Sequence, residues 1–265
     1  ITPAAKFIDG NTTGRGAVVA DNDVLALAAI VNYEPITAQV WYHGLTDTLD
    51  NIFGQVDFGH TFDNGAKLGL GVQYATTDVE SNVTADGDQS TQGVDADFFG
   101  VQATLGYDIF SAKVGYTVAN ADDNVTTTGV GVLSLEDHGA YYKAGEIGRN
   151  LISDLPKIKS YTNGFKSGEL TSWYITVNSK IPAVAGLDVG VDYIELESDL
   201  HQSTADVSVE EVVLRTSYKH NKNWDFSSYY SMASKSTNGV INADAPSPGA
   251  EFDVDEFRVQ ARYKF

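Results

Sequence analysis

The chain closes on the stretch EFRVQARYKF, residues 256–265, in which apolar and polar side chains alternate at every step. The apolar series is Phe257, Val259, Ala261, Tyr263 and Phe265, and the polar series is Arg258, Gln260, Arg262 and Lys264. Because successive side chains of a β-strand point to opposite faces, this stretch predicts a strand with one apolar and one polar face. A soluble sheet can alternate in this way, but an end on Phe265 after Tyr263 is less ordinary for one.

The same period of two recurs along most of the chain. In LDVGVDY, residues 187–193, Val189 and Val191 lie opposite Asp188 and Asp192. No stretch combines a 3.6-residue period with helix caps, and the longest apolar run, VLALAAIV at 24–31, is far shorter than the ~20 residues of a membrane helix. We therefore predict an all-β protein of about twelve strands. The expected strands are 14–21, 24–34, 37–45, 51–62, 67–78, 96–108, 110–120, 171–181, 187–198, 209–220, 224–235 and 256–265.

The connections between these strands fall into two classes by length. Short ones include FDNGAK at 62–67 and HNKNWD at 220–225, whereas 79–95, 120–170 and 237–255 are long and polar. Short turns on one side and long loops on the other are typical of an antiparallel transmembrane β-barrel, with the turns in the periplasm and the loops outside. A sheet in hydrocarbon must also close, because every backbone amide needs a partner there. We predict one barrel domain over 1–265 with a long extracellular loop at 120–170; a soluble β-sandwich, which also alternates, is the alternative.

A barrel assigns each face of a strand to a medium. The apolar face, including Val189 and Val191, is expected to meet lipid, and aromatic rings near the strand ends are expected to form interfacial girdles. The predicted girdle is Tyr33, Tyr107, Trp173, Tyr193, Trp224, Tyr263 and Phe265. The predicted lumen-facing charges are Lys67, Lys113, Lys180, Asp188, Asp192, Arg215, Asp225, Arg258, Arg262 and Lys264.

Composition excludes several classes of function. The formal net charge is −19, from 17 basic and 36 acidic residues, and such acidity argues against a nucleic-acid partner. The chain has no cysteine, its five histidines show no metal-ligand spacing, and no G-x-S-x-G motif occurs, so we predict that it is not an enzyme. DND at 21–23 and DGD at 86–88 are only fragments of a calcium loop, so no cofactor is expected and Ca²⁺ stays a candidate. A pore would instead select by charge and width, and the acids around 78–97 predict a cation preference at the outer mouth.

Three stretches carry a family resemblance. YKF at 263–265, HNKNWDFSSYYSM at 220–232 and TPAAKFIDGNTTGRGAVV at 2–19 resemble the Campylobacter-type major outer membrane porins, which are related in architecture to the OprD-like porins. The resemblance implies a homotrimer of barrels with about 16–18 strands in the bacterial outer membrane, with about six strands preceding Ile1. Ile1 would lie in or just after the inward-folded loop that narrows the pore, and Asp9 would match an acidic residue there. The hairpin at 21–23 is shorter than the family pattern.

The sequence thus predicts a porin that lets ions and small hydrophilic solutes diffuse through a water-filled barrel. Asp9, Arg15, Glu146 and Arg149 are the candidates for its constriction, the last two because AGEIGRN lies in the longest loop. Lipid and lipopolysaccharide are the expected surroundings. The alternative is a barrel that serves mainly as an adhesin or surface structural protein through its long loops.

Overall fold

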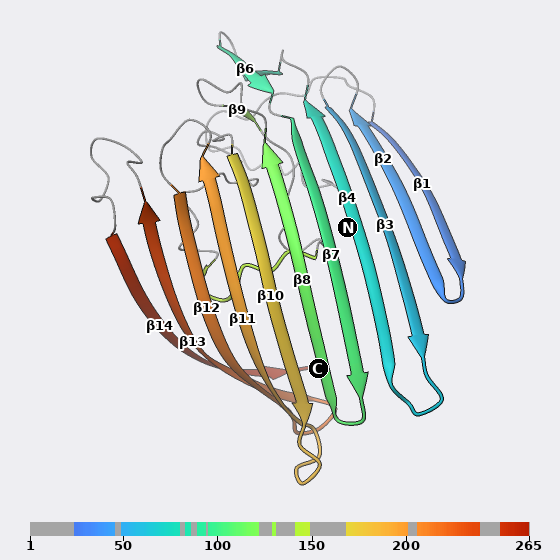
Figure 1. The fold of residues 1–265 in the computed structure, drawn as a ribbon, viewed down its shortest axis with the longest axis vertical. Helices are drawn as coiled ribbons and strands as arrows, with labels where there is room; N and C mark the ends of the chain where they lie inside the picture. Colours follow the sequence, from blue (N-terminus) through green and yellow to red (C-terminus); the bar gives the residue numbers. More distant parts are fainter. Residues whose placement is uncertain are drawn as a thin grey trace.

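The computed structural model describes residues 24–45, 49–79, 83–85, 89–93, 95–121, 129–130, 141–148, 168–200, 206–238 and 250–264. Eleven strands form one sheet in the order β1-β2-β3-β4-β7-β8-β10-β11-β12-β13-β14, and all neighbours in it are antiparallel (Figure 1). The strands are β1 (Val24–Tyr33), β2 (Ile36–Leu45), β3 (Leu49–Thr61), β4 (Lys67–Val79), β7 (Ala96–Tyr107), β8 (Phe110–Ala121), β10 (Gly168–Lys180), β11 (Leu187–Leu200), β12 (Asp206–Lys219), β13 (Trp224–Asn238) and β14 (Ala250–Tyr263).

The predicted antiparallel all-β fold is confirmed, with two corrections to the elements. Eleven of the twelve expected strands lie in the sheet, and the twelfth, at 14–21, falls outside the described residues. The last strand, β14, begins at Ala250 and not at 256. A separate three-stranded sheet of β5 (Val83–Ala85), β6 (Gln89–Gly93) and β9 (Gly129–Val130) lies within stretches that we predicted as loops.

Sheet topology separates two ends, which are called the turn end and the loop end below. At the turn end, strands are joined by the short connections 34–35, 62–66, 108–109, 181–186 and 220–223. The long connections all leave from the other end, at the top of Figure 1. The strands run from ten to fifteen residues. Since about 9–11 residues of a tilted strand suffice to cross a bilayer, most strands are long enough to project beyond it.

Two faces of the sheet differ in character over the turn-end half. The outer face is that of Val191, which is 46 % exposed, and the inner face is that of its neighbour Asp192, which is 2 % exposed. In register with Val191 on the outer face are Val177 of β10 and Leu214 of β12. The expectation that the Val189–Val191 flank is not packed in a core therefore holds for Val191.

The two faces exchange character toward the loop end. On β11, Ile194 and Leu196 point inward and are fully buried, while Glu197 lies exposed on the outer face. On β12, Val207 and Val209 are likewise buried at 1 % exposure on the inner face. The core therefore sits inside the curved sheet near its loop end. Its buried members are Phe53, Ala75, Ala96, Phe98, Ala119, Ala144, Leu170, Tyr174, Ile194, Leu196, Val207, Val209 and Val213.

Among the described residues, no helix is both long and apolar enough to cross a membrane.

Candidate functional site

A short segment of the long connection between β8 and β10 lies against the inner face of the sheet. This inward segment is Tyr141–Gly148, with the sequence YYKAGEIG. Figure 1 shows it as a yellow-green trace that crosses the strands roughly halfway along their length. It is attached to the sheet at three places, on β3 and β4, on β10 and β11, and on β12 and β13. It is thus the part of the described chain that reaches farthest across the inner wall.

Tyr141 makes the first attachment. Its backbone N–H donates to Gln73 Oε1 at 2.9 Å, and its hydroxyl donates to the Asp57 carboxylate. Gly71 of β4 leaves room for the ring, because a Cβ there would overlap the Tyr141 hydroxyl and would lie 2.7 Å from Asp57 Oδ1. Burial raises the pKa of Tyr141, and Asp57 raises it further, so the hydroxyl keeps its proton and stays a donor at neutral pH.

The second attachment is an ion pair between the segment and the wall. Lys143 Nζ lies 2.7 Å from Asp192 Oδ1 and 3.0 Å from Thr176 Oγ1, and Ser172 Oγ donates to the Lys143 carbonyl at 2.7 Å. Arg215 also holds Asp192, through Nε at 2.5 Å and Nη2 at 2.9 Å. Burial lowers the pKa of Lys143, and the hydrogen bond to Asp192 opposes that shift. A nearly fully buried carboxylate thus carries two cations that are each about one-third exposed to the inner space.

The third attachment is a single buried carboxylate that takes up a turn of backbone. Glu211 is 1 % exposed, and its Oε1 accepts the N–H groups of Glu146 at 2.9 Å and Ile147 at 3.0 Å. Its Oε2 accepts the Gly148 N–H at 2.8 Å. The Ser231 hydroxyl of β13 donates to Oε1 as well. Gly145 sets up this turn with φ +80°, and a Cβ at that position would overlap Glu211 Oε2.

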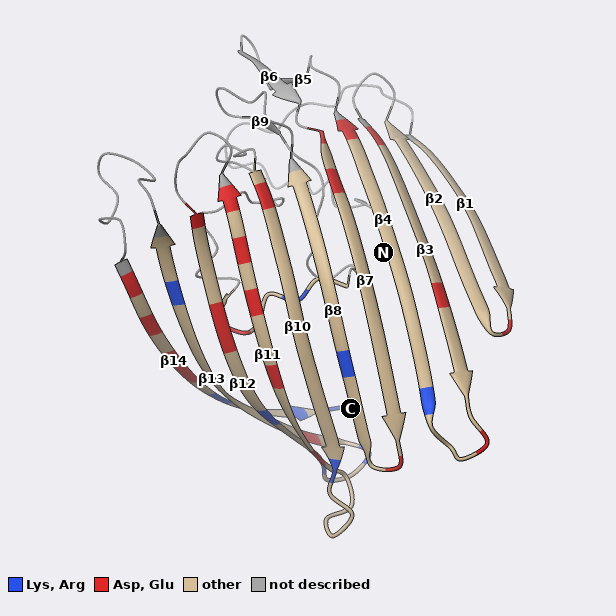
Figure 2. Cartoon of the chain, in the orientation of Figure 1, with Lys and Arg blue, Asp and Glu red and all other residues tan. Residues whose placement is uncertain are grey.

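Acidic residues are concentrated toward the loop end of the sheet, although both signs occur at each end. Figure 2 shows acidic residues near the loop end of β4, β7, β10, β11, β12 and β14, and basic residues nearer the turn end of β4, β8 and β10. At the turn end, Lys264 Nζ pairs with Asp225 Oδ2 at 2.5 Å, and Lys180 lies in register with Asp188. Around the second attachment, burial lowers the pKa of Lys143, the nearby positive charges of Arg215 and Lys113 lower it further, and Asp192 is the acid that opposes this shift. Cations therefore outnumber acids at the second attachment, whereas Asp57 and Glu211 are the charged wall groups at the other two.

The structure places the predicted lumen-facing residues on one face of the sheet. Registers put Lys67, Lys113, Lys180, Asp188, Arg215, Asp225, Arg258 and Arg262 on the Asp192 side of their strands, and Lys264 reaches the same side through Asp225. Their contact with a water-filled lumen stays a prediction. Of the constriction candidates, Glu146 lies half-buried in the inward segment, while Asp9, Arg15 and Arg149 fall outside the described residues.

The ionisable residues Asp57, Tyr141, Lys143 and Glu211 of these attachments are absent from the sequence-based candidates. The two wall carboxylates carried a usable signal, because strand alternation places Glu211 on the same face as Arg215, and Asp57 faces inward on the third strand for the same reason. Tyr141 and Lys143 had no such signal, since the loop that holds them has no period. Within the described ranges, no group of three or more His, Cys, Asp or Glu side chains is arranged to hold a metal ion.

The sequence of the chain matches the family of the Campylobacter major outer membrane protein over residues 6–265. The chain belongs to this family. The predicted resemblance and the predicted location in the bacterial outer membrane are thereby confirmed, and so is the prediction that the chain is not an enzyme, since the family is one of porins. No curated protein matches the chain.

Solved outer-membrane structures share the fold at low sequence identity. OccD3 (OpdP) of Pseudomonas aeruginosa is 13% identical with a TM-score of 0.57, over 91% of this chain and 57% of that one. OccAB1 of Acinetobacter baumannii is 12% identical with a TM-score of 0.55, over 91% and 58%. OmpT of Vibrio cholerae is 12% identical with a TM-score of 0.53, over 90% and 63%. The chain thus spans a little over half the length of these proteins.

Aromatic side chains on the outer face of this family member lie at two heights. Tyr33, Tyr107, Trp224 and Tyr263 lie at the turn end, and the rings of Trp224 and Tyr263 contact each other at a tilt of 57° with centroids 5.0 Å apart. Trp173 and Tyr193, with centroids 5.1 Å apart, lie nearer the loop end. Trp173 is seven residues above Lys180, which is about 23 Å along the strand at ~3.3 Å per residue. At a strand tilt of about 40° this is roughly 18 Å of height, which fits within the ~25 Å apolar band of such barrels. The remaining predicted girdle residue, Phe265, lies outside the described residues.

The upper aromatic residues hydrogen-bond to acids on the adjacent strand. Trp173 Nε1 donates to Glu195 Oε2 at 2.6 Å, and Tyr74 Oη donates to Asp97 Oδ1 at 2.8 Å. Two further pairs repeat the arrangement: Tyr42 with Asp50 at 2.5 Å and Tyr230 with Asp255 at 3.0 Å. A ring with a polar tip suits the boundary between hydrocarbon and headgroups, so these pairs mark where the outer face becomes polar.

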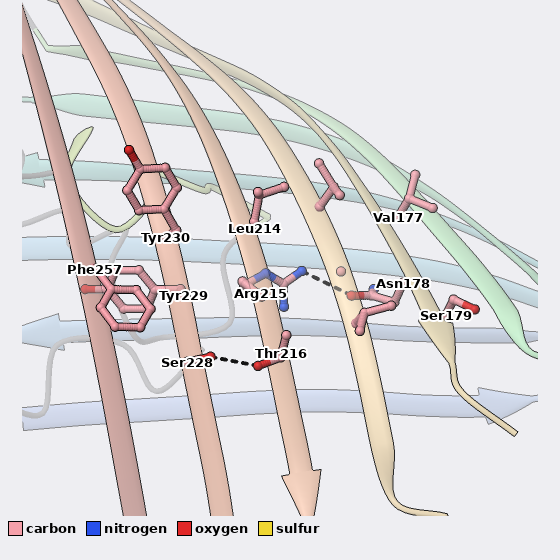
Figure 3. Close-up of a pocket in the computed structure, with 13 residues that line it drawn as sticks. Val177, Asn178, Ser179, Leu214, Arg215, Thr216, Ser228, Tyr229, Tyr230 and Phe257 are labelled. Carbon is pink, nitrogen blue, oxygen red and sulfur yellow. Dashed lines mark hydrogen bonds between the residues drawn. The ribbon is translucent and has the colours of Figure 1, made fainter. Parts of the chain in front are cut away.

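Below these pairs, the outer face carries a shallow hollow across β10 to β14 (Figure 3). It has a volume of about 490 Å³, and Val177, Leu214, Tyr230 and Phe257 provide its apolar surface. The hydroxyls of Thr216 and Ser228 in its wall lie 2.7 Å apart and satisfy each other. A surface without unsatisfied polar groups is compatible with hydrocarbon.

Proposed function

We propose that this chain supplies about half of the wall of an outer-membrane diffusion channel, and that ions and small hydrophilic solutes pass along its inner face. One observation carries the proposal: the segment Tyr141–Gly148 lies across a charged inner face, in a sheet whose outer face is apolar between two rows of aromatic residues. Such a segment narrows a passage without filling the barrel. Selection would then depend on the charge and width beside it.

Charges along the passage suggest two successive filters. The described acids at the loop end lie on the outer face, so they would attract cations only at the rim of the outer mouth. The cluster of Lys113, Lys143 and Arg215 around Asp192 on the inner face would favour anions beside the inward segment. We propose Glu146, with Asp9, Arg15 and Arg149, as further residues of the constriction. The long connection 120–170 would be extracellular, and the inward segment would be its buried part.

Membrane partners follow from the outer face and the family. The acids above the upper aromatic pairs would contact lipopolysaccharide headgroups, whose phosphates need divalent cations between them and carboxylates. Ca²⁺ is the candidate ion, and no resident cofactor is proposed. A homotrimer is proposed from the family resemblance.

Planar-bilayer recording on the protein purified from outer membranes tests the proposal. Stable open channels that admit small sugars in a vesicle-swelling assay are the expected result. A membrane-inserted protein with no conductance and no swelling would refute the channel and would favour the adhesin or surface structural role of the loops.

A further inference from the structure

We infer that Glu211 is the positioning residue that keeps the inward segment on the wall and so sets the width of the passage. The inference rests on the proposed channel function. It starts from an unusual burial: Glu211 is a carboxylate with 1 % exposure on a strand whose inner neighbours Val209 and Val213 are apolar. A buried carboxylate is costly unless hydrogen bonds satisfy it.

The donors that satisfy Glu211 come mainly from the segment and not from the sheet. Three successive N–H groups, of Glu146, Ile147 and Gly148, donate at 2.9, 3.0 and 2.8 Å. The sheet contributes the Ser231 hydroxyl. The three amides belong to a loop segment and take part in no strand pairing, so Glu211 is their acceptor. The carboxylate therefore needs these donors, and the donors need the carboxylate.

At the two other attachments, the wall acids keep other partners if the segment is released. Lys143 pairs with Asp192, but Asp192 keeps its two bonds from Arg215 if Lys143 leaves. Tyr141 binds Asp57 by one hydroxyl, and Gln55 Nε2 also donates to Asp57 Oδ2 at 2.5 Å. The wall acids at those two places therefore stay satisfied after release, whereas Glu211 and the three amides do not. Loss of each charge-assisted bond lowers the ratio of docked to released segment by about 10- to 100-fold.

Glu211→Gln tests the inference, with Glu210→Gln as the matched control because Glu210 is the adjacent, exposed residue on the outer face. In the whole protein, Glu211→Gln is expected to raise single-channel conductance or to add transitions to a larger open level. Glu210→Gln is expected to leave conductance unchanged. Ser231→Ala, which removes one donor and keeps the carboxylate, is expected to give an effect in the same direction and smaller.

Cysteine cross-linking gives a readout that does not depend on conduction. The chain contains no cysteine, and a Cβ at Gly148 would lie 3.5 Å from Val209 Cγ1, so Gly148→Cys with Val209→Cys can bridge the segment to β12. The same Cβ would lie 3.0 Å from Glu211 Oε2, so the double-cysteine protein with Glu211 is the reference for each comparison. Oxidation is expected to form the disulfide quickly with Glu211 and at least about 10-fold more slowly with Gln at that position. The closed disulfide should return the Glu211→Gln channel to the conductance of the parent, and reductant should reverse this.

The outcomes separate the inference from the proposed function. Equal cross-linking rates and equal conductance for Glu211→Gln and Glu210→Gln would overturn the role of Glu211. A parent protein that inserts but never conducts would refute the channel, while the cross-linking rates would still decide whether Glu211 holds the segment. If Glu211→Gln does not insert, Ser231→Ala decides by the same two measurements.

Discussion

Lys143→Met should make the channel more selective for cations. Lys143 is the basic side chain of the inward segment, its Nζ lies 2.7 Å from Asp192, and 29% of its side chain is exposed. The substitution removes one positive charge from the narrowed part of the passage. Arg215 still satisfies Asp192, and Tyr141 and Glu211 still hold the segment, so the bore itself should change little.

The size of the effect follows from Coulomb's law. At about 6 Å in water, a unit charge changes the energy of a passing monovalent ion by roughly 0.7 kcal/mol. A Debye length of about 10 Å at 0.1 M salt reduces this to about 0.4 kcal/mol, or roughly a twofold change in occupancy. Cations gain and anions lose by this factor, so the cation-to-anion permeability ratio should rise about fourfold.

The reversal potential in a KCl gradient measures this ratio directly. The control is Lys222→Met, which removes the same charge from an exposed position in the turn between β12 and β13. It should shift the reversal potential much less. An equal shift for the two variants, or a shift of Lys143→Met toward anions, would refute the assignment of Lys143 to the passage. Raising the salt concentration should shrink the difference, because screening shortens its range.

Three further outcomes are expected. Gly145→Ala places a side chain against Glu211 on a backbone with φ +80°, which weakens docking of the inward segment. Conductance should therefore rise, as is expected for Glu211→Gln, without a change in barrel insertion. Val191→Arg should lower the free energy of unfolding from lipid vesicles by about 2–4 kcal/mol, because this position faces mid-bilayer hydrocarbon in the proposed barrel. Glu197→Arg, on the same face but nearer the loop end, should lower it far less. Equal losses of stability for the two variants would contradict the proposed lipid band. The pKa of Lys143 is lowered by burial, so this side chain should lose its charge at a lower pH than a lysine in water does. Cation preference should then increase on the alkaline side, and Lys143→Met should remove that component of the pH profile.

Alternation in the sequence was sufficient to predict the strands and their two faces near the turn end. In the proposed barrel, hydrocarbon outside and water inside would impose opposite preferences at successive residues there, as in Asp188 to Asp192 of β11. The same rule placed Arg258 and Arg262 correctly on the face opposite Phe257 and Val259. Lipid leaves a regular signature because it is uniform along the strand.

That rule fails where the strand leaves the lipid. The stretch AEFDVDEF opens β14 with acids outward, while Val254 lies opposite Ala233 on the inner face, so the polarity is reversed with respect to the residues that follow. A pattern read from the end of the chain therefore stops near 256, and the strand appears six residues too short. The reversal has a physical cause: above the aromatic pairs, the outer face meets headgroups and water, and the inner face meets the packed core.

The inward segment could not be predicted from the sequence because its position depends on partners far along the chain. Gly145 and Gly148 read as ordinary loop glycines, and Glu211 reads as one more polar residue on an inward strand face. Only the folded sheet brings Glu211 to the amides of Glu146 and Gly148, which precede it by 65 and 63 residues in the sequence. No periodic pattern encodes such a contact.

Energetic comparison indicates why a carboxylate and not the core determines whether this segment docks. Ala144 and Ile147 are buried against the inner wall, and burying a side chain of the size of Ile147 contributes roughly 1.5–3 kcal/mol. The buried amides of Ile147 and Gly148 and the partly buried amide of Glu146 would cost about 1–3 kcal/mol each without acceptors, which together equals or exceeds that gain. With an apolar residue in place of Glu211, the cost of the unsatisfied amides would therefore outweigh the gain from burying Ala144 and Ile147, and the segment would not dock. With Glu211 in place, the same three amides become favourable contacts, so a single side chain changes the sign of docking. This accounts for a charged residue at a site where Val207, Val209 and Val213 fill the neighbouring inner positions of the strand.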